Sequence, residues 1–261
     1  MEIIIPDETT AIAELAADAV CALIDRKPDA VIGLATGSSP LPLYAELIRR
    51  YKAGEVSFSR ATAFTLDEYV GLPKDHPEAY ANVIRNEFTD HVDFADGAVH
   101  YLDGLAPDLA AQCVTYEEEI ARAGGVDLQI LGIGTSGHIA FNEPSSSFAS
   151  RTRVKSLMPQ TRQDNARFFD GDLDQVPVYC LTQGLGTIME ARHVVLIAYG
   201  QGKADAVRRL VEGPVSSMCP ASILQHHPHV SILVDGEAGG ELEHRDYYRS
   251  AWKNKPQWQG L

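Results

Sequence analysis

The stretch VDLQILGIGTSGH, residues 126–138, indicates the fold more clearly than any other part of this sequence. Its first half is a short and nearly continuous apolar run, which is typical of a strand buried on both faces. Its second half is a glycine-rich loop that ends at His138. A buried strand that leads into such a loop favours a parallel sheet covered by helices.

The same alternation of apolar runs and helical patterns extends in both directions along the chain. We expect further strands at 30–36, 61–66, 193–200 and 229–235, and helices at 7–25, 39–54, 77–91, 107–123 and 201–211. Strands that alternate with helices predict an α/β fold with a doubly wound, Rossmann-like, mostly parallel sheet and helices on both faces. Because no linker, repeat or charge run divides the chain, we predict a single sheet and a single domain over residues 1–261. In such sheets ligands bind beyond the carboxyl ends of the strands.

Composition excludes several classes of partner. The chain has 261 residues, of which 45% are hydrophobic and 22% charged, which is ordinary for a globular protein. Its net charge of −14 repels nucleic acid and anionic membrane surfaces, so we expect neither as a partner. A small anionic substrate is still compatible with this charge, because salt screens distant charges and a few local cations can dominate.

Cysteine and histidine spacing predicts no metal site. The cysteines show no CxxC pattern and are expected to be reduced, buried thiols: Cys21, Cys113, Cys180 and Cys219. The cluster His226, His227 and His229 has no second ligand pair, so we interpret it as structural. The N-terminus lacks a signal-peptide pattern, and no apolar run approaches the roughly 18 residues of a membrane span. We therefore expect a cytoplasmic protein.

Two strand ends are candidate phosphate sites. The first expected strand runs into Thr36-Gly37-Ser38-Ser39, and a helix begins directly afterwards. The N–H groups and partial positive charge of a helix N-terminus suit a phosphate, although a serine cap with nothing bound fits this motif equally well. Lys203 stands in the first turn of another helix, where its charge opposes the helix dipole unless an anion offsets it. An ordinary surface lysine is the alternative; otherwise both strand ends could hold one phosphate together.

Two other strand ends carry candidate proton-transfer groups. Asp67 and Glu68 end a strand, where one of the two can face a cleft, although a solvated turn is the alternative. His138 follows a strand end in a glycine-rich loop, which is not typical of a core histidine. An unperturbed imidazole titrates near pH 6.5, about neutrality, so it can move protons there. A carboxylate such as Glu143, five residues later, can fix its tautomer.

Long strings of the sequence resemble the glucosamine-6-phosphate deaminase family. They are TLDEYVGLP (65–73), GIGTSGHIAFNEP (132–144), SRTRVKSL (150–157), ARFF (166–169) and the segment around Lys203. The resemblance spans nearly the whole chain and weakens only near the C-terminus. It implies a Rossmann-like domain without metal or redox cofactor that converts a sugar phosphate, glucosamine 6-phosphate, into fructose 6-phosphate and ammonia.

The resemblance also implies roles for individual residues. His138 matches the histidine that opens the pyranose ring, Glu143 the carboxylate that supports it, and Asp67 the base that moves the C2 proton. The family's ligands of the substrate's phosphate are matched in this chain by Arg167, Lys203 and the loop Thr36, Gly37, Ser38 and Ser39. The glycines of the histidine loop, Gly134 and Gly137, are expected to let backbone N–H groups approach the substrate.

One position departs from the family's pattern. Family members carry Asp or Asn two residues before the histidine, whereas this chain has Ser136. Our hypothesis is that Glu143 alone orients His138, with Ser136 a weaker helper or a spectator. Some members are hexamers activated by N-acetylglucosamine 6-phosphate, and Ser146, Arg153 and Lys155 resemble their effector ligands. A homo-oligomer and such activation are therefore expectations, and the alternative is that Arg153 and Lys155 stabilise their strand region.

The sequence leaves three alternative functions open. A lactonase acting on a phosphorylated sugar lactone would not need Asp67 as a base for a carbon acid. A non-catalytic sugar-phosphate sensor of a transcription regulator is disfavoured, because the chain has no room for a basic DNA-binding module. An oxidoreductase ranks last, since no GxGxxG follows a strand. The sequence does not distinguish the gluco from the galacto epimer, or the direction in which the reaction runs.

Overall fold

The centre of the molecule is a seven-stranded sheet in which every pair of neighbours is parallel. The computed structural model describes residues 1–256 and 259–261. The strand order is β1-β10-β9-β6-β2-β3-β5, so the expected mostly parallel α/β sheet is confirmed. The strands are β1 (Glu2–Ile4), β2 (Val31–Leu34), β3 (Thr62–Thr65), β5 (Val99–His100), β6 (Leu128–Leu131), β9 (His193–Ala198) and β10 (Val230–Val234).

The central strands are buried on both faces, which explains their continuous apolar sequence. Every residue of β6, β9 and β10 is buried. The one amide in β6, Gln129, lies against Gly33 of β2, where an added Cβ would come within 2.0 Å of its Oε1. Gly33 is therefore required for the close contact between β2 and β6.

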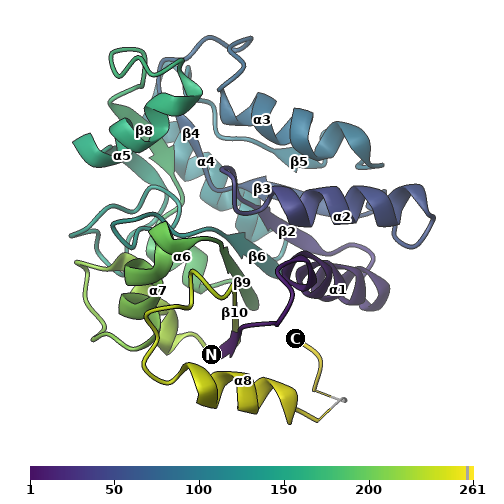
Figure 1. Ribbon diagram of the computed structural model, residues 1–261. Helices are drawn as coiled ribbons and strands as arrows, with labels where there is room; N and C mark the ends of the chain where they lie inside the picture. Colours follow the sequence, from purple (N-terminus) through teal and green to yellow (C-terminus); the bar gives the residue numbers. More distant parts are fainter. Residues whose placement is uncertain (257–258) are drawn as a thin grey trace.

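Helices surround the sheet, and their bounds lie within a few residues of the expected ones where they were expected (Figure 1). They are α1 (Thr10–Arg26), α2 (Leu41–Lys52), α3 (Tyr80–Glu87), α4 (Leu109–Arg122), α5 (Pro159–Asn165), α6 (Leu185–Met189), α7 (Ala204–Val211) and α8 (Arg245–Lys253). In α1 the buried residues Ile12, Ala16, Val20 and Ile24 recur every fourth position and form one face. Thr9 occupies the N-cap of α1 but makes no side-chain capping bond.

A second, smaller sheet was not expected from the sequence, so the expectation of a single sheet is wrong in this respect. Strands β4 (Asp67–Tyr69), β8 (Tyr179–Thr182) and β7 (Arg153–Ser156) form it with antiparallel pairing, in the order β4-β8-β7. These strands have three or four residues each, which is too short for a clear alternation of polar and apolar residues. The chain passes from β3 into β4 after one residue, so the small sheet begins where the large one ends (Figure 1).

The strand order creates a switch point at the centre of the large sheet. Strands β2 and β6 are neighbours, and the chain runs outward from them in opposite directions, through β3 and β5 on one side and through β9 and β10 on the other. In doubly wound sheets the crevice beyond such a switch point is the usual ligand site. The segments that follow β3, β2, β6 and β9 carry most of the predicted site residues and therefore meet at this edge.

Candidate active site

A cavity of about 380 Å³ lies at the carboxyl ends of the central strands. Its size is within the roughly 300–1,000 Å³ range of small-molecule sites. Most of the site residues expected from the sequence line it: Thr36, Gly37, Ser38, Ser39, Asp67, Gly134, His138, Arg167 and Lys203. The structure thus brings Asp67 and His138, from different strands, to one cavity.

Two cationic side chains, Lys203 and Arg167, line the cavity. Lys203 ends a 3₁₀ turn (Gln201–Lys203) directly before α7, and Arg167 lies in another 3₁₀ turn after α5. Burial lowers the pKa of Lys203, and the neighbouring charge of Arg167 lowers it further, while Asp164 opposes the effect. A bound anion would offset the electrostatic repulsion between these two cations. The loop 36–39, with its hydroxyls and the following N-terminus of α2, lines the same cavity.

The adjacent acids Asp67 and Glu68 point in different directions, as neighbours in a strand do. Asp67 is 5% exposed and lines the cavity. Burial raises the pKa of Asp67 to about 8, and the charge of Glu68 adds to this effect. Glu68 instead accepts backbone N–H bonds from Tyr69 (2.8 Å), Tyr80 (2.9 Å) and Ala81 (2.9 Å), so it anchors the start of α3.

His138 is held through its Nδ1 atom. Glu143 Oε2 lies 3.3 Å from Nδ1, and Ser136 Oγ lies 2.9 Å from it. Burial by itself would raise the pKa of Glu143, but the nearby His138, together with Thr161 and the Met158 N–H, which donates to Oε1 at 3.1 Å, outweighs burial and lowers it. An ionised Glu143 favours the tautomer with the proton on Nδ1, which leaves Nε2 as the basic nitrogen.

The two glycines of the histidine loop have different roles. A Cβ on Gly134 would lie 2.1 Å from Nε2 and Cε1 of His138, so only glycine allows the imidazole to fold over this residue. Gly137 has φ +84° and faces Cys219 Sγ, which would be 2.6 Å from an added Cβ. Gly137 does not line the cavity. The turn and packing on Cys219 are thus sufficient to explain Gly137, and the approach of its backbone to the substrate stays a prediction.

The three effector-ligand candidates lie outside this cavity. Ser146 is 2% exposed, and its hydroxyl donates to the Glu143 carbonyl at 2.6 Å. Arg153 and Lys155 lie on β7 in the small sheet, on the same face of that strand. The hydroxyl of Ser146 thus donates within its own turn, and the role of these three residues towards an effector stays a prediction.

Several residues that line the cavity were not predicted from the sequence. Tyr80 and Asn165, from α3 and α5, line the cavity together with Phe141. The Tyr80 hydroxyl donates to that of Tyr69 at 3.3 Å, and Asn165 Nδ2 donates to the same Tyr69 oxygen at 2.8 Å. No local signal marks these residues, since only the folding of α3 and α5 over the strand ends brings them to the site.

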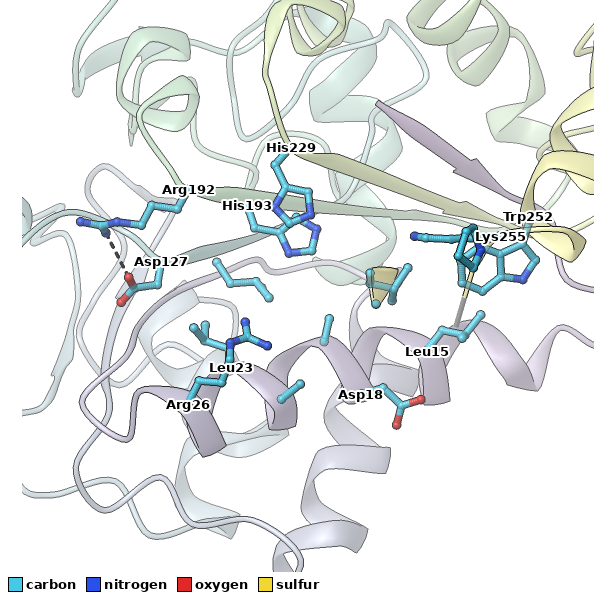
Figure 2. A pocket seen from close by; sticks show the side chains of 16 residues that line it. Leu15, Asp18, Leu23, Arg26, Asp127, Arg192, His193, His229, Trp252 and Lys255 are labelled. Carbon is cyan, nitrogen blue, oxygen red and sulfur yellow. Dashed lines mark hydrogen bonds and ion pairs between the residues drawn. The ribbon is translucent and has the colours of Figure 1, made fainter. Parts of the chain in front are cut away.

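A second cavity, of about 530 Å³, lies at the opposite edge of the sheet (Figure 2). It is lined by α1 and by residues at the amino ends of strands, among them Asp127 and His193. His193 stacks on His229 at 3.7 Å between ring centroids, and burial lowers the pKa of His193 to about 3. Since the amino ends of parallel strands are not where doubly wound sheets bind ligands, we place the chemistry at the other edge.

Within residues 1–256 and 259–261, no group of three or more His, Cys, Asp or Glu side chains could hold a metal ion. His227 bonds Ala191 O through Nε2 and accepts the His229 N–H at Nδ1, which agrees with a structural role. All four cysteines are free, and three are buried while Cys21 is partly exposed. None of the helices in the described part of the chain has the length and apolar character of a membrane span.

Residues 7–232 match the family described as glucosamine-6-phosphate isomerases/6-phosphogluconolactonase. The chain belongs to this family. A family relative named glucosamine-6-phosphate deaminase, from Mycolicibacterium smegmatis, is 65% identical over 261 residues and covers all of both chains. A second relative with the same name, from Streptomyces coelicolor, is 53% identical with the same full coverage.

Solved structures from the family share this fold. A monomeric glucosamine-6-phosphate deaminase has a TM-score of 0.90 and 41% identity, and the match covers 92% of this chain and 100% of that one. A 6-phosphogluconolactonase from Trypanosoma cruzi has a TM-score of 0.75 at 21% identity, covering 93% and 97% of the two chains. The second likeness shows a common fold only.

Proposed function

We propose that this protein is a glucosamine-6-phosphate deaminase, which converts glucosamine 6-phosphate and water into fructose 6-phosphate and ammonia. The observation that carries the proposal is one cavity that combines a buried carboxylate, a carboxylate-supported imidazole and a pair of cations. Full-length identity of 65% to a relative of that name supports the same substrate and reaction.

The two cations that line the cavity would bind the substrate's phosphate. Lys203 and Arg167 supply charge, and the loop 36–39 supplies hydroxyl and backbone donors. The phosphate is remote from the carbons that react, so its binding energy can hold C1 and C2 against the catalytic groups.

His138 would open the pyranose ring. Its unprotonated Nε2 takes the proton from the C1 hydroxyl, the C1–O5 bond breaks, and the imidazolium returns the proton to O5. An imidazole performs both halves of this step because its pKa lies near neutrality. Glu143, next to Nδ1, stabilises the imidazolium that forms between the two halves.

Asp67 would then act as the base for the C2 proton of the open-chain sugar. It removes the proton from C2 while the C1 oxygen takes up a proton from the C2 ammonium group, which gives an enolamine, and it then delivers its proton to C1, which leaves a protonated imine at C2. Water adds to C2, a proton passes from this water to the nitrogen, and the C–N bond breaks, so that ammonia leaves and a ketone is formed at C2. The base must be ionised, whereas burial raises the pKa of Asp67 to about 8. The substrate's own ammonium group at C2 would favour the carboxylate form when bound.

This scheme breaks a C–N bond with water, and its proton transfers need only His138, Asp67, the substrate's own amino group and water, so we propose a hydrolytic enzyme without cofactor. Amino-sugar catabolism, including that of N-acetylglucosamine, is the pathway class that would use it. A cytoplasmic location, a homo-oligomer and activation by N-acetylglucosamine 6-phosphate stay predictions from the sequence. Rate curves that remain hyperbolic and unaltered on adding that compound would exclude activation.

An ammonia-release assay tests the proposal directly. Purified protein is given glucosamine 6-phosphate or galactosamine 6-phosphate, with and without N-acetylglucosamine 6-phosphate, and ammonia is measured by a coupled dehydrogenase. Hydrolysis of 6-phosphogluconolactone is measured in parallel. Ammonia from an amino-sugar phosphate is the expected result, whereas lactone hydrolysis without ammonia from either epimer would refute the proposal and favour the lactonase.

A further inference from the structure

Arg209, on α7, holds the turn that carries His138, although it does not line the cavity. Its Nη2 donates to the Thr135 carbonyl at 3.0 Å, and its Nη1 donates to the Ser136 carbonyl at 3.2 Å. The third nitrogen, Nε, donates to Asp205 Oδ2 at 2.8 Å. The planar guanidinium thus spans two successive peptide carbonyls while Asp205 fixes its orientation.

The turn itself leaves these two carbonyls facing outward. Its internal bonds run from Gly134 N–H to the His138 carbonyl and from Gly137 N–H to the Gly134 carbonyl, both at 2.9 Å. In the described part of the chain, Arg209 makes the only hydrogen bonds to the carbonyls of Thr135 and Ser136. The orientation of these peptides therefore depends on a side chain from another element.

The position of these peptides matters because Ser136 carries a hydroxyl that touches His138. Ser136 Oγ lies 2.9 Å from His138 Nδ1, closer than Glu143 Oε2 at 3.3 Å. A hydroxyl is neutral, so it lacks the charge attraction that would draw a carboxylate to the same nitrogen. The position of a neutral acceptor such as the Ser136 hydroxyl must instead be set by its backbone. Arg209 donates its hydrogen bonds to this backbone.

We propose that Arg209 is a positioning residue that acts through Ser136: by fixing the two peptides it keeps the Ser136 hydroxyl on the Nδ1–H of His138. The inference rests on the proposed function, in which His138 moves the protons of ring opening. It assigns to Ser136 a direct contact with the imidazole, beyond the helper or spectator role expected from the sequence.

Arg208 provides a matched control on the same helix. It pairs with the other oxygen of Asp205 at 2.7 Å and lies 3.7 Å from Glu241, and its side chain is 44% exposed. Arg208 therefore shares the charge, the helix and the acidic partner of Arg209, and no hydrogen bond joins it to the turn in the described part of the chain. A loss of activity specific to Arg209 would separate the contact to the turn from general stabilisation of α7.

The test is a double-mutant cycle on turnover with glucosamine 6-phosphate. We expect Arg209→Gln and Ser136→Ala each to lower kcat about 10-fold with little change in KM, because neither residue is among the proposed ligands of the phosphate. If Arg209 acts through Ser136, the double variant is also about 10-fold impaired, and not about 100-fold as independent effects would give. Arg208→Gln should stay within about twofold of wild type. Independent effects, or equal losses for Arg208→Gln and Arg209→Gln, would overturn the inference.

A readout without substrate separates this inference from the proposed function. The NMR titration of the His138 Cε1–H signal, assigned with His138→Gln, should shift in Arg209→Gln and in Arg209→Lys but not in Arg208→Gln. Lysine keeps the charge and loses the two-pronged donor, so it covers the case in which the glutamine variant does not fold. An unshifted titration in Arg209→Lys contradicts the positioning role even if wild type releases ammonia. A shift in a protein that releases no ammonia would instead count against the proposed function alone.

Discussion

Replacing Asp67 by Asn should reduce activity and increase stability at the same time. Asn has nearly the same shape but cannot accept the C2 proton, so kcat should fall by about 10²–10⁴-fold, the usual contribution of a positioned base. Binding of the phosphate should change little, because its proposed ligands, Lys203 and Arg167, are unchanged and the charge of Asp67 is not among the causes that shift the pKa of Lys203. Ammonia release and inhibition by inorganic phosphate measure the two effects separately.

The stability gain follows from the buried carboxyl group. Asp67 has a pKa of about 8 when folded, against an ordinary value of 3.8. The folded protein therefore binds this proton more tightly than the unfolded chain does, and the contribution of Asp67 to stability falls as pH rises from about 4 to about 8. At about 1.36 kcal/mol per pH unit, the loss approaches 4 kcal/mol at pH 7, and structural relaxation reduces it to about 2–4 kcal/mol.

Urea denaturation at pH 4 and pH 8 measures this difference. Wild type and Asp67→Asn should be equally stable near pH 4, where both side chains are neutral, and the variant should be more stable by about 2–4 kcal/mol near pH 8. Glu68→Gln is the matched control, because Glu68 accepts three backbone N–H groups and its replacement should destabilise by about 1–3 kcal/mol. Undiminished ammonia release by Asp67→Asn would refute the assigned base, and a stability difference independent of pH would refute the argument from burial.

Three further substitutions test other parts of the site. Lys203→Met should raise KM about 10-fold or more while kcat stays within a few fold, because the phosphate is bound alike in ground and transition states; a loss confined to kcat in steady-state assays would contradict this. Glu143→Gln should lower kcat by more than Ser136→Ala does, since only the carboxylate stabilises an imidazolium; equal losses would remove that division of roles. Gly134→Ala should nearly abolish turnover, because the new Cβ would lie 2.1 Å from the His138 ring, while the melting temperature reports any general damage. Near-normal kinetics of this variant would show that the ring is free to move.

The fold could be predicted where the sequence signal is local. The central strands have continuous apolar runs because both of their faces are buried, and this pattern identified β2, β3, β6, β9 and β10. The edge strands β1 and β5 have three and two residues, too few for any period to be recognised. The small sheet could not be predicted because its three strands are equally short, and because they pair across long stretches of chain.

The candidate site divides in the same way. Residue type and place after a strand were enough to select Asp67, His138 and Lys203, because parallel strands all point their carboxyl ends to one edge. Which of two adjacent acids faces the cavity was decided by the small sheet, which directs Asp67 inward and Glu68 towards the start of α3. Nothing in the local sequence around Arg209 indicated a role.

By itself, then, the sequence determined the strand-helix alternation, the edge at which ligands bind and the chemical types gathered there, because these depend on local periodicity and on the direction of parallel strands. Only the tertiary structure decided the distances: Ser136 and Glu143 on the same nitrogen of His138, Arg167 beside Lys203, and Arg209 across two carbonyls of another element. The contacts of Arg209 and Lys203 join residues far apart in the chain, so their geometry follows from how the helices pack on the sheet. Ser136 and Glu143 are near His138 in sequence, but the irregular loop that carries them has no period from which their distances could be predicted.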